Sequence, residues 1–372
     1  MMRFIDLNHQ YELIEDRISK RINAILKKGS FIMGPEVVEL EDKLKSYVGV
    51  SHCVTCANGT DALQLSLMAL GIGAGDKVIT TPFTFFATAE AISIVGATPV
   101  FIDIEEDTYN ISPDKLDTYL GSINADEKES LKAVIAVDLF GLPANYEKLS
   151  EICHEHNLKL IEDGAQSFGA TLNGKKTGSF GDISTTSFFP AKPLGCYGDG
   201  GAVFTDSEVL AEKVRSLRVH GKGQDKYDNI AIGLNSRLDT IQAGVLLEKL
   251  SIFDGEVLNR QKVADNYTKE IDQNFVLPFA PESFSCVWAQ YSLRCQSSEE
   301  RNRLQEKLKE RNIPTQVYYK VPLHLQQAFK SLGYKKGDFE VSESVSETIF
   351  SLPMHPYLNP EDQNLIIESL NA

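Results

Sequence analysis

The sequence predicts an α/β protein, with a seven-stranded, mostly parallel sheet and a smaller C-terminal domain of α+β character. Seven short, β-rich runs alternate with helical patterns between residues 53 and 205. Most of these runs are apolar throughout, which is typical of parallel strands buried on both faces. After about residue 250 this alternation stops, and short strands and helices rich in Pro and Tyr follow.

The N-terminal part of the chain is predicted to be helical. Residues 1–30 form an N-terminal helical segment. A second helix is expected to begin at Pro35, because proline is favoured in the first turn of a helix. Four apolar residues follow at the spacing of one helix face: Val37, Leu40, Leu44 and Val48.

The strands and the remaining helices divide the rest of the chain into two predicted domains. A large domain covers residues 31–252, and a small domain covers residues 253–372. Helical crossovers fit between the first five strands, which makes those strands parallel. The last two strands are joined by a glycine-rich loop without a helix, so one of them is expected to run antiparallel. A long helical stretch from Val245 to about Ile271 leads into the small domain. The predicted strands are 53–57, 78–81, 99–104, 133–137, 158–162, 183–189 and 202–205.

Composition narrows the class of protein. The chain has 372 residues, a net charge of −15 and 42% hydrophobic residues, which is enough for a large core. The negative charge argues against nucleic acid and anionic membranes as partners. Six scattered cysteines are too few for a disulfide framework, no metal site is predicted, and no apolar run reaches transmembrane length. The N-terminal residues do not read as a signal peptide, so we expect a reduced, cytoplasmic protein.

Lys192 lies in an unusual local sequence. It stands between Pro190 and Pro193, which excludes a helix interior and favours an extended backbone at Lys192. Its surroundings are aromatic and glycine-rich, without close carboxylates, and therefore poorly suited to a surface ion pair. Such a setting suits a lysine whose amine must at times be neutral, as a Schiff-base lysine requires.

Two further motifs follow predicted strands. Asn58, Gly59 and Thr60 open an apolar helix, and a helix N-terminus with a glycine and a hydroxyl suits phosphate. The alternative is that Asn58 or Thr60 simply caps this helix. Glu162 and Asp163 end a buried strand, where the ligands of open α/β sheets gather. Asp163 could pair with a protonated ring nitrogen, or it could cap a helix.

Two weaker motifs complete a possible cofactor site. Phe85 follows the second strand and could stack on a planar cofactor, although a lone phenylalanine is ordinarily part of the core. Asn235 and Arg237 follow Gly233 in a polar turn and offer anion ligands, with a capping turn as the alternative. Taken together, a Schiff-base lysine, a phosphate cup, a carboxylate and a stacking ring are the parts of a pyridoxal phosphate site.

The motifs also resemble a known family across nearly the whole chain. The chain is similar to the DegT/DnrJ/EryC1/StrS nucleotide-sugar aminotransferases of fold type I, which use pyridoxal 5'-phosphate. Within that family, the loop 187–201 is especially similar to members that act on UDP-2-acetamido-2-deoxy-3-oxo-glucuronate for bacterial surface polysaccharides. The motifs that carry the resemblance are 58–63, 162–167, 187–201 and 235–239.

The resemblance implies a role for each residue of the cofactor site. Lys192 would bind the cofactor covalently and Asp163 would pair with its ring nitrogen, so these two are the predicted catalytic residues. Gln166 would contact the ring hydroxyl, and Phe85 would stack on the ring. The predicted phosphate ligands are Gly59, Thr60 and Ser187.

The resemblance also implies a homodimer with shared active sites. Asn235 would reach the phosphate of the neighbouring subunit's cofactor, and Arg237 would reach that subunit's substrate. The amino donor would be L-glutamate. This sequence departs from the family at its substrate segment, because Tyr318 replaces a histidine expected to touch the sugar. Together with Tyr319 and the additional charge of Lys320, it leaves the exact sugar open.

Other functions stay open at this point. An aminotransferase for dTDP-3-keto or UDP-4-keto hexoses fits the same motifs. A pyridoxamine-dependent sugar dehydratase is disfavoured, because relatives of that kind carry histidine at the position of Lys192. A non-catalytic regulator that retained the fold is disfavoured by the intact lysine, carboxylate and phosphate cup.

Overall fold

The computed structural model describes residues 2–225 and 227–372. Its centre is a seven-stranded sheet with the strand order β1-β9-β8-β5-β4-β2-β3. Only β9 runs antiparallel, to both of its neighbours, and all other adjacent pairs are parallel. The strands are β1 (His52–Cys56), β2 (Lys77–Thr80), β3 (Thr98–Phe101), β4 (Leu131–Val137), β5 (Lys159–Asp163), β8 (Ile183–Ser187) and β9 (Gly201–Thr205).

All seven predicted strands are present in this one sheet, and the fold-class prediction is confirmed. The antiparallel strand follows from the loop of Lys192. The 13 residues that separate β8 from β9, 188–200, contain no helix. A parallel return across the sheet usually needs a crossover helix. The chain therefore turns back beside β8 and pairs Ser187 with Gly201.

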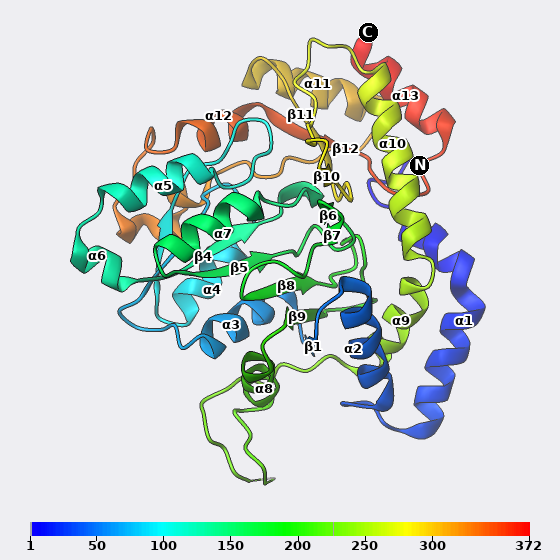
Figure 1. Cartoon of the computed structure of the whole chain (residues 1–372). Helices are drawn as coiled ribbons and strands as arrows, with labels where there is room; N and C mark the ends of the chain where they lie inside the picture. The colour runs from blue at the N-terminus through cyan, green and yellow to red at the C-terminus, as the bar shows by residue number, and fades with distance from the viewer. Residues whose placement is uncertain (1, 226) are drawn as a thin grey trace.

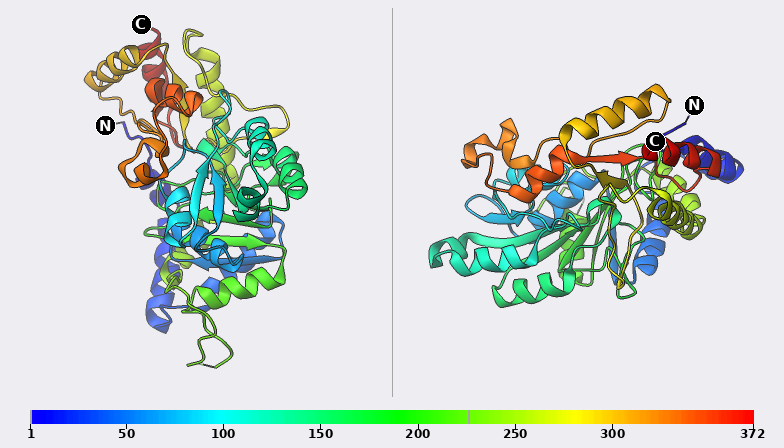
Figure 2. Two further views of the ribbon diagram at one scale, coloured as in Figure 1. Left: turned by 90° about the vertical axis from the view of Figure 1, so that its left-hand side faces the viewer. Right: turned by 90° about the horizontal axis from the view of Figure 1, so that it is seen from above.

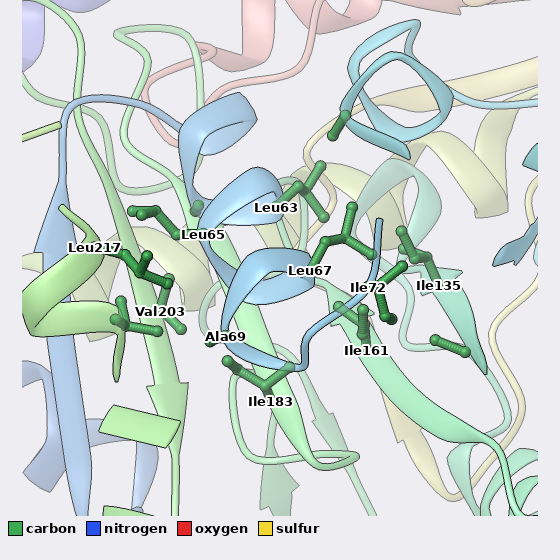
Figure 3. Packing of buried hydrophobic residues seen from close by; sticks show 14 of the residues in the cluster. Leu63, Leu65, Leu67, Ala69, Ile72, Ile135, Ile161, Ile183, Val203 and Leu217 are labelled. Atoms are coloured by element: carbon green, nitrogen blue, oxygen red, sulfur yellow. The ribbon is translucent and has the colours of Figure 1, made fainter. Parts of the chain in front are cut away.

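Helices cover both faces of the sheet (Figures 1 and 2). Helices α3 (Gly59–Ala69) and α8 (Glu208–Leu217) pack on one face, where α3 places Leu63, Leu65 and Leu67 against the strands (Figure 3). On the other face lie α2 (Pro35–Val48), α5 (Pro113–Ser122), α7 (Tyr146–Glu155) and α9 (Thr240–Leu250). Adjacent residues of β4 show this division, because Ile135 faces α3 and Val134 faces the opposite layer.

The predicted N-terminal helices are present. Helix α1 (Leu7–Lys28) packs against α9, with Ile14 and Ile18 touching Val245. Helix α2 begins at Pro35 as expected. Its buried apolar residues are those predicted from the helical spacing, namely Val37, Leu40, Leu44 and Val48.

The long helical stretch predicted from Val245 to Ile271 is wrong in detail. Two helices occupy this region, α9 and α10 (Phe253–Glu270), and Ser251 and Ile252 separate them. The amide of Ile252 donates to the carbonyl of Lys249, which tightens the chain into a turn. Neither proline nor glycine marks this break, because it depends on where the two helices pack.

The C-terminal part has a core of its own and α+β character. Tyr267 of α10, Tyr291 and Phe350 are fully buried there. The boundaries 1–30, 31–252 and 253–372 stay a proposal, because contacts cross them: the amide of Met354 donates to the carbonyl of Phe4. Besides α10, the C-terminal part contains β10 (Phe284–Ser285), β11 (Tyr291–Arg294), α11 (Ser298–Glu310), the short 3-10 helices Leu323–Leu325 and Gln327–Leu332, α12 (Glu340–Thr348), β12 (Ile349–Leu352) and α13 (Pro360–Asn371).

No helix within residues 2–225 and 227–372 is both long and apolar enough to cross a membrane.

Candidate active site

A cavity of about 970 Å³ lies at the carboxyl ends of the parallel strands. Loops that follow β1, β2, β5 and β8 form much of its wall, and the segment 318–321 contributes another part. Ile5, Gln290, Leu323 and Gln326 complete the lining. This is the edge at which open α/β sheets bind ligands. Ten of the predicted site residues line the cavity: Gly59, Thr60, Phe85, Asp163, Gln166, Ser187, Lys192, Tyr318, Tyr319 and Lys320.

Lys192 lies in the β8–β9 loop, which folds back on itself. Its amide donates to the carbonyl of Phe189 at 2.8 Å. A Cβ atom at Gly195 would lie 2.5 Å from the carbonyl oxygen of Pro190, so this turn requires glycine. Burial lowers the pKa of Lys192 from its ordinary value, and the negative charge of Asp163 partly opposes this shift. The lowered pKa increases the fraction of Lys192 whose amine is neutral and therefore nucleophilic.

Asp163 is the last residue of β5 and is only 4% exposed. The hydroxyl of Thr88 donates to its Oδ2 at 2.8 Å, and the amide of Ala165 donates to its Oδ1 at 3.3 Å. Burial raises the pKa of Asp163, whereas both hydrogen bonds and the charge of Lys192 lower it. A cation placed against this carboxylate would favour its ionised form further.

The predicted phosphate cup is the N-terminus of α3. Asn58 is the cap of this helix, because its side chain accepts from the amide of Asp61 at 2.8 Å. The amides of Gly59 and Thr60 lie in the first turn, where a helix has no internal partners for them. A Cβ atom at Gly59 would lie 2.7 Å from the Cβ of Ser187, so glycine allows the helix end to approach this serine. Asn58 therefore caps the helix, and Gly59, Thr60 and Ser187 stay the predicted phosphate ligands.

Phe85 and Gln166 lie on the cavity wall. Phe85 is 56% exposed, unlike the fully buried Phe83, so the core alternative does not apply to it. Its ring lies 6.3 Å from the ring of Tyr319. The side-chain oxygen of Gln166 accepts from the amide of Phe140 at 3.0 Å, and its Nε2 donates to the hydroxyl of Tyr319 at 3.3 Å. Gln166 thus connects the sheet edge to the substrate segment.

Asn235 and Arg237 do not line this cavity. They follow an extension between α8 and α9 that projects away from the body of the molecule (Figure 1). Arg237 makes no ion pair with any residue the structure describes. Asn235 is exposed and Arg237 is half-buried.

Thr88 was not predicted as a site residue. It lies in the first turn of α4 (Ala87–Ile94), where a threonine ordinarily reads as a helix cap. Its contact with Asp163 spans 75 positions of sequence. The only local signal is the presence of two hydroxyls four residues apart after the buried strand β2, with Thr84 in the loop before α4 and Thr88 in its first turn.

The comparisons with known proteins agree with this geometry. The model of the DegT/DnrJ/EryC1/StrS aminotransferase family matches residues 12–371. The UDP-2-acetamido-2-deoxy-3-oxo-D-glucuronate aminotransferase of Pseudomonas aeruginosa is 43% identical over 371 residues, 100% of this chain and 99% of the relative.

The chain belongs to the DegT/DnrJ/EryC1/StrS aminotransferase family.

Other aminotransferases support the same assignment. A dTDP-3-amino-3,6-dideoxy-alpha-D-galactopyranose transaminase of Aneurinibacillus thermoaerophilus is 38% identical, over 100% of this chain and 99% of its own. The crystal structure of a family member from Brucella abortus superposes with a TM-score of 0.95 at 47% identity, covering 100% and 98% of the two chains. NtdA from Bacillus subtilis, with bound cofactor PMP, gives a TM-score of 0.88 at 29% identity, covering 99% and 82%.

This aminotransferase uses pyridoxal 5'-phosphate as its cofactor and a nucleotide-linked keto sugar as a substrate. The cavity fits the cofactor on three observations. Phe85 presents an exposed ring face, Gly59 leaves room beside Ser187 at a helix N-terminus, and Asp163 offers a buried carboxylate. The phosphate, the pyridine ring and the ring nitrogen therefore each have a chemically matched group, and the amine of Lys192 in the same cavity matches the aldehyde carbon.

Proposed function

We propose that this aminotransferase transfers the amino group of L-glutamate to UDP-2-acetamido-2-deoxy-3-oxo-glucuronate, in the cytoplasm, for O-antigen and other bacterial surface polysaccharides. The full-length identity of 43% to the Pseudomonas aeruginosa enzyme supports the choice of sugar. The observation that carries the proposal is Lys320. Apart from Lys192, it is the only cationic side chain among the described residues that line the cavity.

Lys320 is suited to an anionic sugar. It is exposed, and none of the ion pairs among the described residues includes it. The carboxylate of a uronic acid, or a diphosphate oxygen, would gain a charge-assisted hydrogen bond from its ammonium group. Tyr318 and Tyr319 precede it on the same segment and would contact the sugar.

The residues of the cavity divide the chemistry between them. When bound, pyridoxal 5'-phosphate draws electrons away from the bond that breaks beside the amine nitrogen. Lys192, neutral once its amine is released, removes the proton from the α-carbon of the donor and returns a proton at the cofactor's C4′ carbon. Asp163 keeps a proton on the ring nitrogen, because its negative charge favours the cationic ring. Gly59, Thr60 and Ser187 hold the phosphate.

We expect a panel of nucleotide keto sugars to single out the uronic acid. With L-glutamate as donor and the product identified by mass, the wild-type enzyme should aminate the 3-oxo-glucuronate fastest. Lys320→Met keeps the length of the side chain and removes its charge. It should lower kcat/KM for the uronic acid by about tenfold or more, the effect of one charge-assisted hydrogen bond.

The matched comparison for Lys320→Met is a keto hexose without a carboxylate. If kcat/KM falls equally for both sugars, Lys320 contacts the diphosphate rather than the uronate.

If wild type prefers a dTDP-3-keto or UDP-4-keto hexose, the proposed sugar is wrong. The relative from Aneurinibacillus thermoaerophilus makes such hexoses the second candidate. Lys192 itself argues against a dehydratase, and release of 2-oxoglutarate from glutamate would exclude a purely regulatory protein.

We propose further that the active site is completed by a second copy of this chain. Among the described residues, three carboxylates but only two cations line the cavity, although it must accept the phosphates of both cofactor and nucleotide. Asn235 and Arg237 are suitable phosphate and substrate ligands, yet they lie outside the cavity of their own chain. Beside them, Ile230 and Ile232 are 70% and 90% exposed, as expected of a surface that a second subunit covers.

Subunit complementation should reveal this sharing. Lys192→Ala and Arg237→Ala are each expected to be inactive as homodimers. A mixed dimer, isolated through two different affinity tags, would contain one site with both residues intact. It should recover about half of the wild-type rate per dimer, since one of two sites is complete. No recovery in a verified mixed dimer would show that Arg237 acts within its own chain.

A further inference from the structure

Two threonine hydroxyls continue the hydrogen bonding of Asp163 into the protein. The hydroxyl of Thr88 contacts Oδ2 of Asp163 at 2.8 Å, and the hydroxyl of Thr84 contacts that of Thr88 at 3.3 Å. Both threonines are only 1% exposed. The order along this chain of groups is therefore Thr84, Thr88 and Asp163, and all three residues line the cavity wall.

The number of protons on each group determines which one donates in the hydrogen bonds between Thr84, Thr88 and Asp163. A hydroxyl has one proton to donate, and an ionised carboxylate only accepts. With Asp163 ionised, Thr88 must donate to Asp163, and Thr84 must then donate to Thr88. The amide of Ala165 donates to the other carboxylate oxygen. Each oxygen of the ionised Asp163 thus accepts one bond within the protein and retains capacity for another.

We propose that Thr88, supported by Thr84, is a positioning residue that holds the Asp163 carboxylate ionised and correctly oriented for the cofactor's ring nitrogen. This inference rests on the proposed role of Asp163. The bond from Thr88 offsets part of the cost of a buried charge, and hydrogen bonds arranged in series strengthen one another.

Among the side chains around Asp163, Thr88 is the one whose support stays constant. Lys192 also stabilises the negative charge, but only while its amine is protonated. Lys192 becomes neutral whenever it acts as a base, so its support is lost at that point. Burial and the nearby negative charge of Asp163 raise the pKa of the Tyr319 hydroxyl. This hydroxyl is a hydrogen-bond partner of Gln166 rather than of Asp163. The Thr88 hydroxyl keeps its proton throughout.

The test compares three variants of the holoenzyme. Thr88→Val removes the hydroxyl at nearly constant volume, and Thr88→Ser retains it. Thr80→Val is the matched control, because Thr80 is equally buried but donates to the carbonyl of Ile135 and does not line the cavity. The rate of the glutamate half-reaction and the dissociation constant of the cofactor are measured for each, together with thermal stability.

We expect Thr88→Val to lower the half-reaction rate by about ten- to a hundredfold, with little change in the KM for glutamate. Cofactor binding should weaken by about tenfold. Thr88→Ser should restore both properties to near wild type, and Thr84→Val should have a smaller effect than Thr88→Val.

Two results would overturn the inference. In the first, Thr88→Val and Thr80→Val have the same half-reaction rate and the same cofactor affinity, and their thermal stability decreases by a similar amount. In the second, Thr88→Ser fails to restore activity, so that the methyl group rather than the hydroxyl matters. Failure of the proposed function is distinguishable, because wild type would then show no glutamate half-reaction while the cofactor-affinity comparison would still report on Thr88.

Discussion

Lys192→Ala should lower the rate of amine transfer by about 10⁴-fold, the upper end of what general acid–base catalysis contributes. The loss is this large because one amine both binds the cofactor and moves the proton. The lowered pKa of Lys192 supports the same use, since burial favours its neutral form. Release of 2-oxoglutarate from L-glutamate measures the rate, and the visible absorbance of the bound cofactor reports on its attachment.

Two companion variants separate the amine of Lys192 from its charge. Lys192→Arg retains a positive charge but no nucleophile, because a guanidinium group stays protonated in proteins. It should be as inactive as Lys192→Ala. Lys336→Ala removes an exposed lysine paired with Glu347 on the surface, and it should behave as wild type. Full turnover by Lys192→Ala would remove the role assigned to this residue.

Asp163→Asn is expected to have the second largest effect. The substitution preserves size but removes the negative charge that would face the ring nitrogen. Loss of one partner from a buried ion pair costs about 3–5 kcal/mol, which corresponds to a rate reduction of about 10²- to 10⁴-fold. The half-reaction with L-glutamate and retention of the cofactor during dialysis should both decrease.

The control for Asp163→Asn is Asp182→Asn. Asp182 lies immediately before β8, at the other end of the sheet from the cavity, and pairs with Lys159 at 2.7 Å. This variant should lose some stability but keep its rate. A near-normal half-reaction in Asp163→Asn would show that the ring nitrogen does not need this carboxylate, and the inference about Thr88 would then have no basis.

Local patterns predicted the elements of this fold well. Helix α2 and its buried face followed from Pro35 and the spacing of four apolar residues, all within four turns of chain. The loop without a helix predicted that one of the last two strands runs antiparallel, and the structure shows that this strand is β9. The break at Ser251 and Ile252 was missed, because its sequence carries no helix breaker and the turn depends on packing against distant residues.

In the candidate active site, too, features that depend on neighbouring residues could be predicted, whereas contacts between distant residues could not. The motifs around Asn58, Asp163 and Lys192 could each be recognised from neighbouring residues, because capping, strand ends and proline act over a few positions. Thr88 could not be recognised, since its partner lies 75 residues away. Asn235 and Arg237 lie outside the cavity of their own chain, and no local pattern could show this.

The sequence by itself determined which residues have reactive or ligand-binding chemistry, because side-chain identity and backbone preference are local properties. The tertiary structure decided their arrangement. The order of the strands brings the ends of β1, β2, β5 and β8 to one edge, where Gly59, Phe85, Asp163 and Lys192 line a single cavity. Strand order depends on how all layers of the core pack together, so distances across the sheet follow from the whole chain rather than from any one motif.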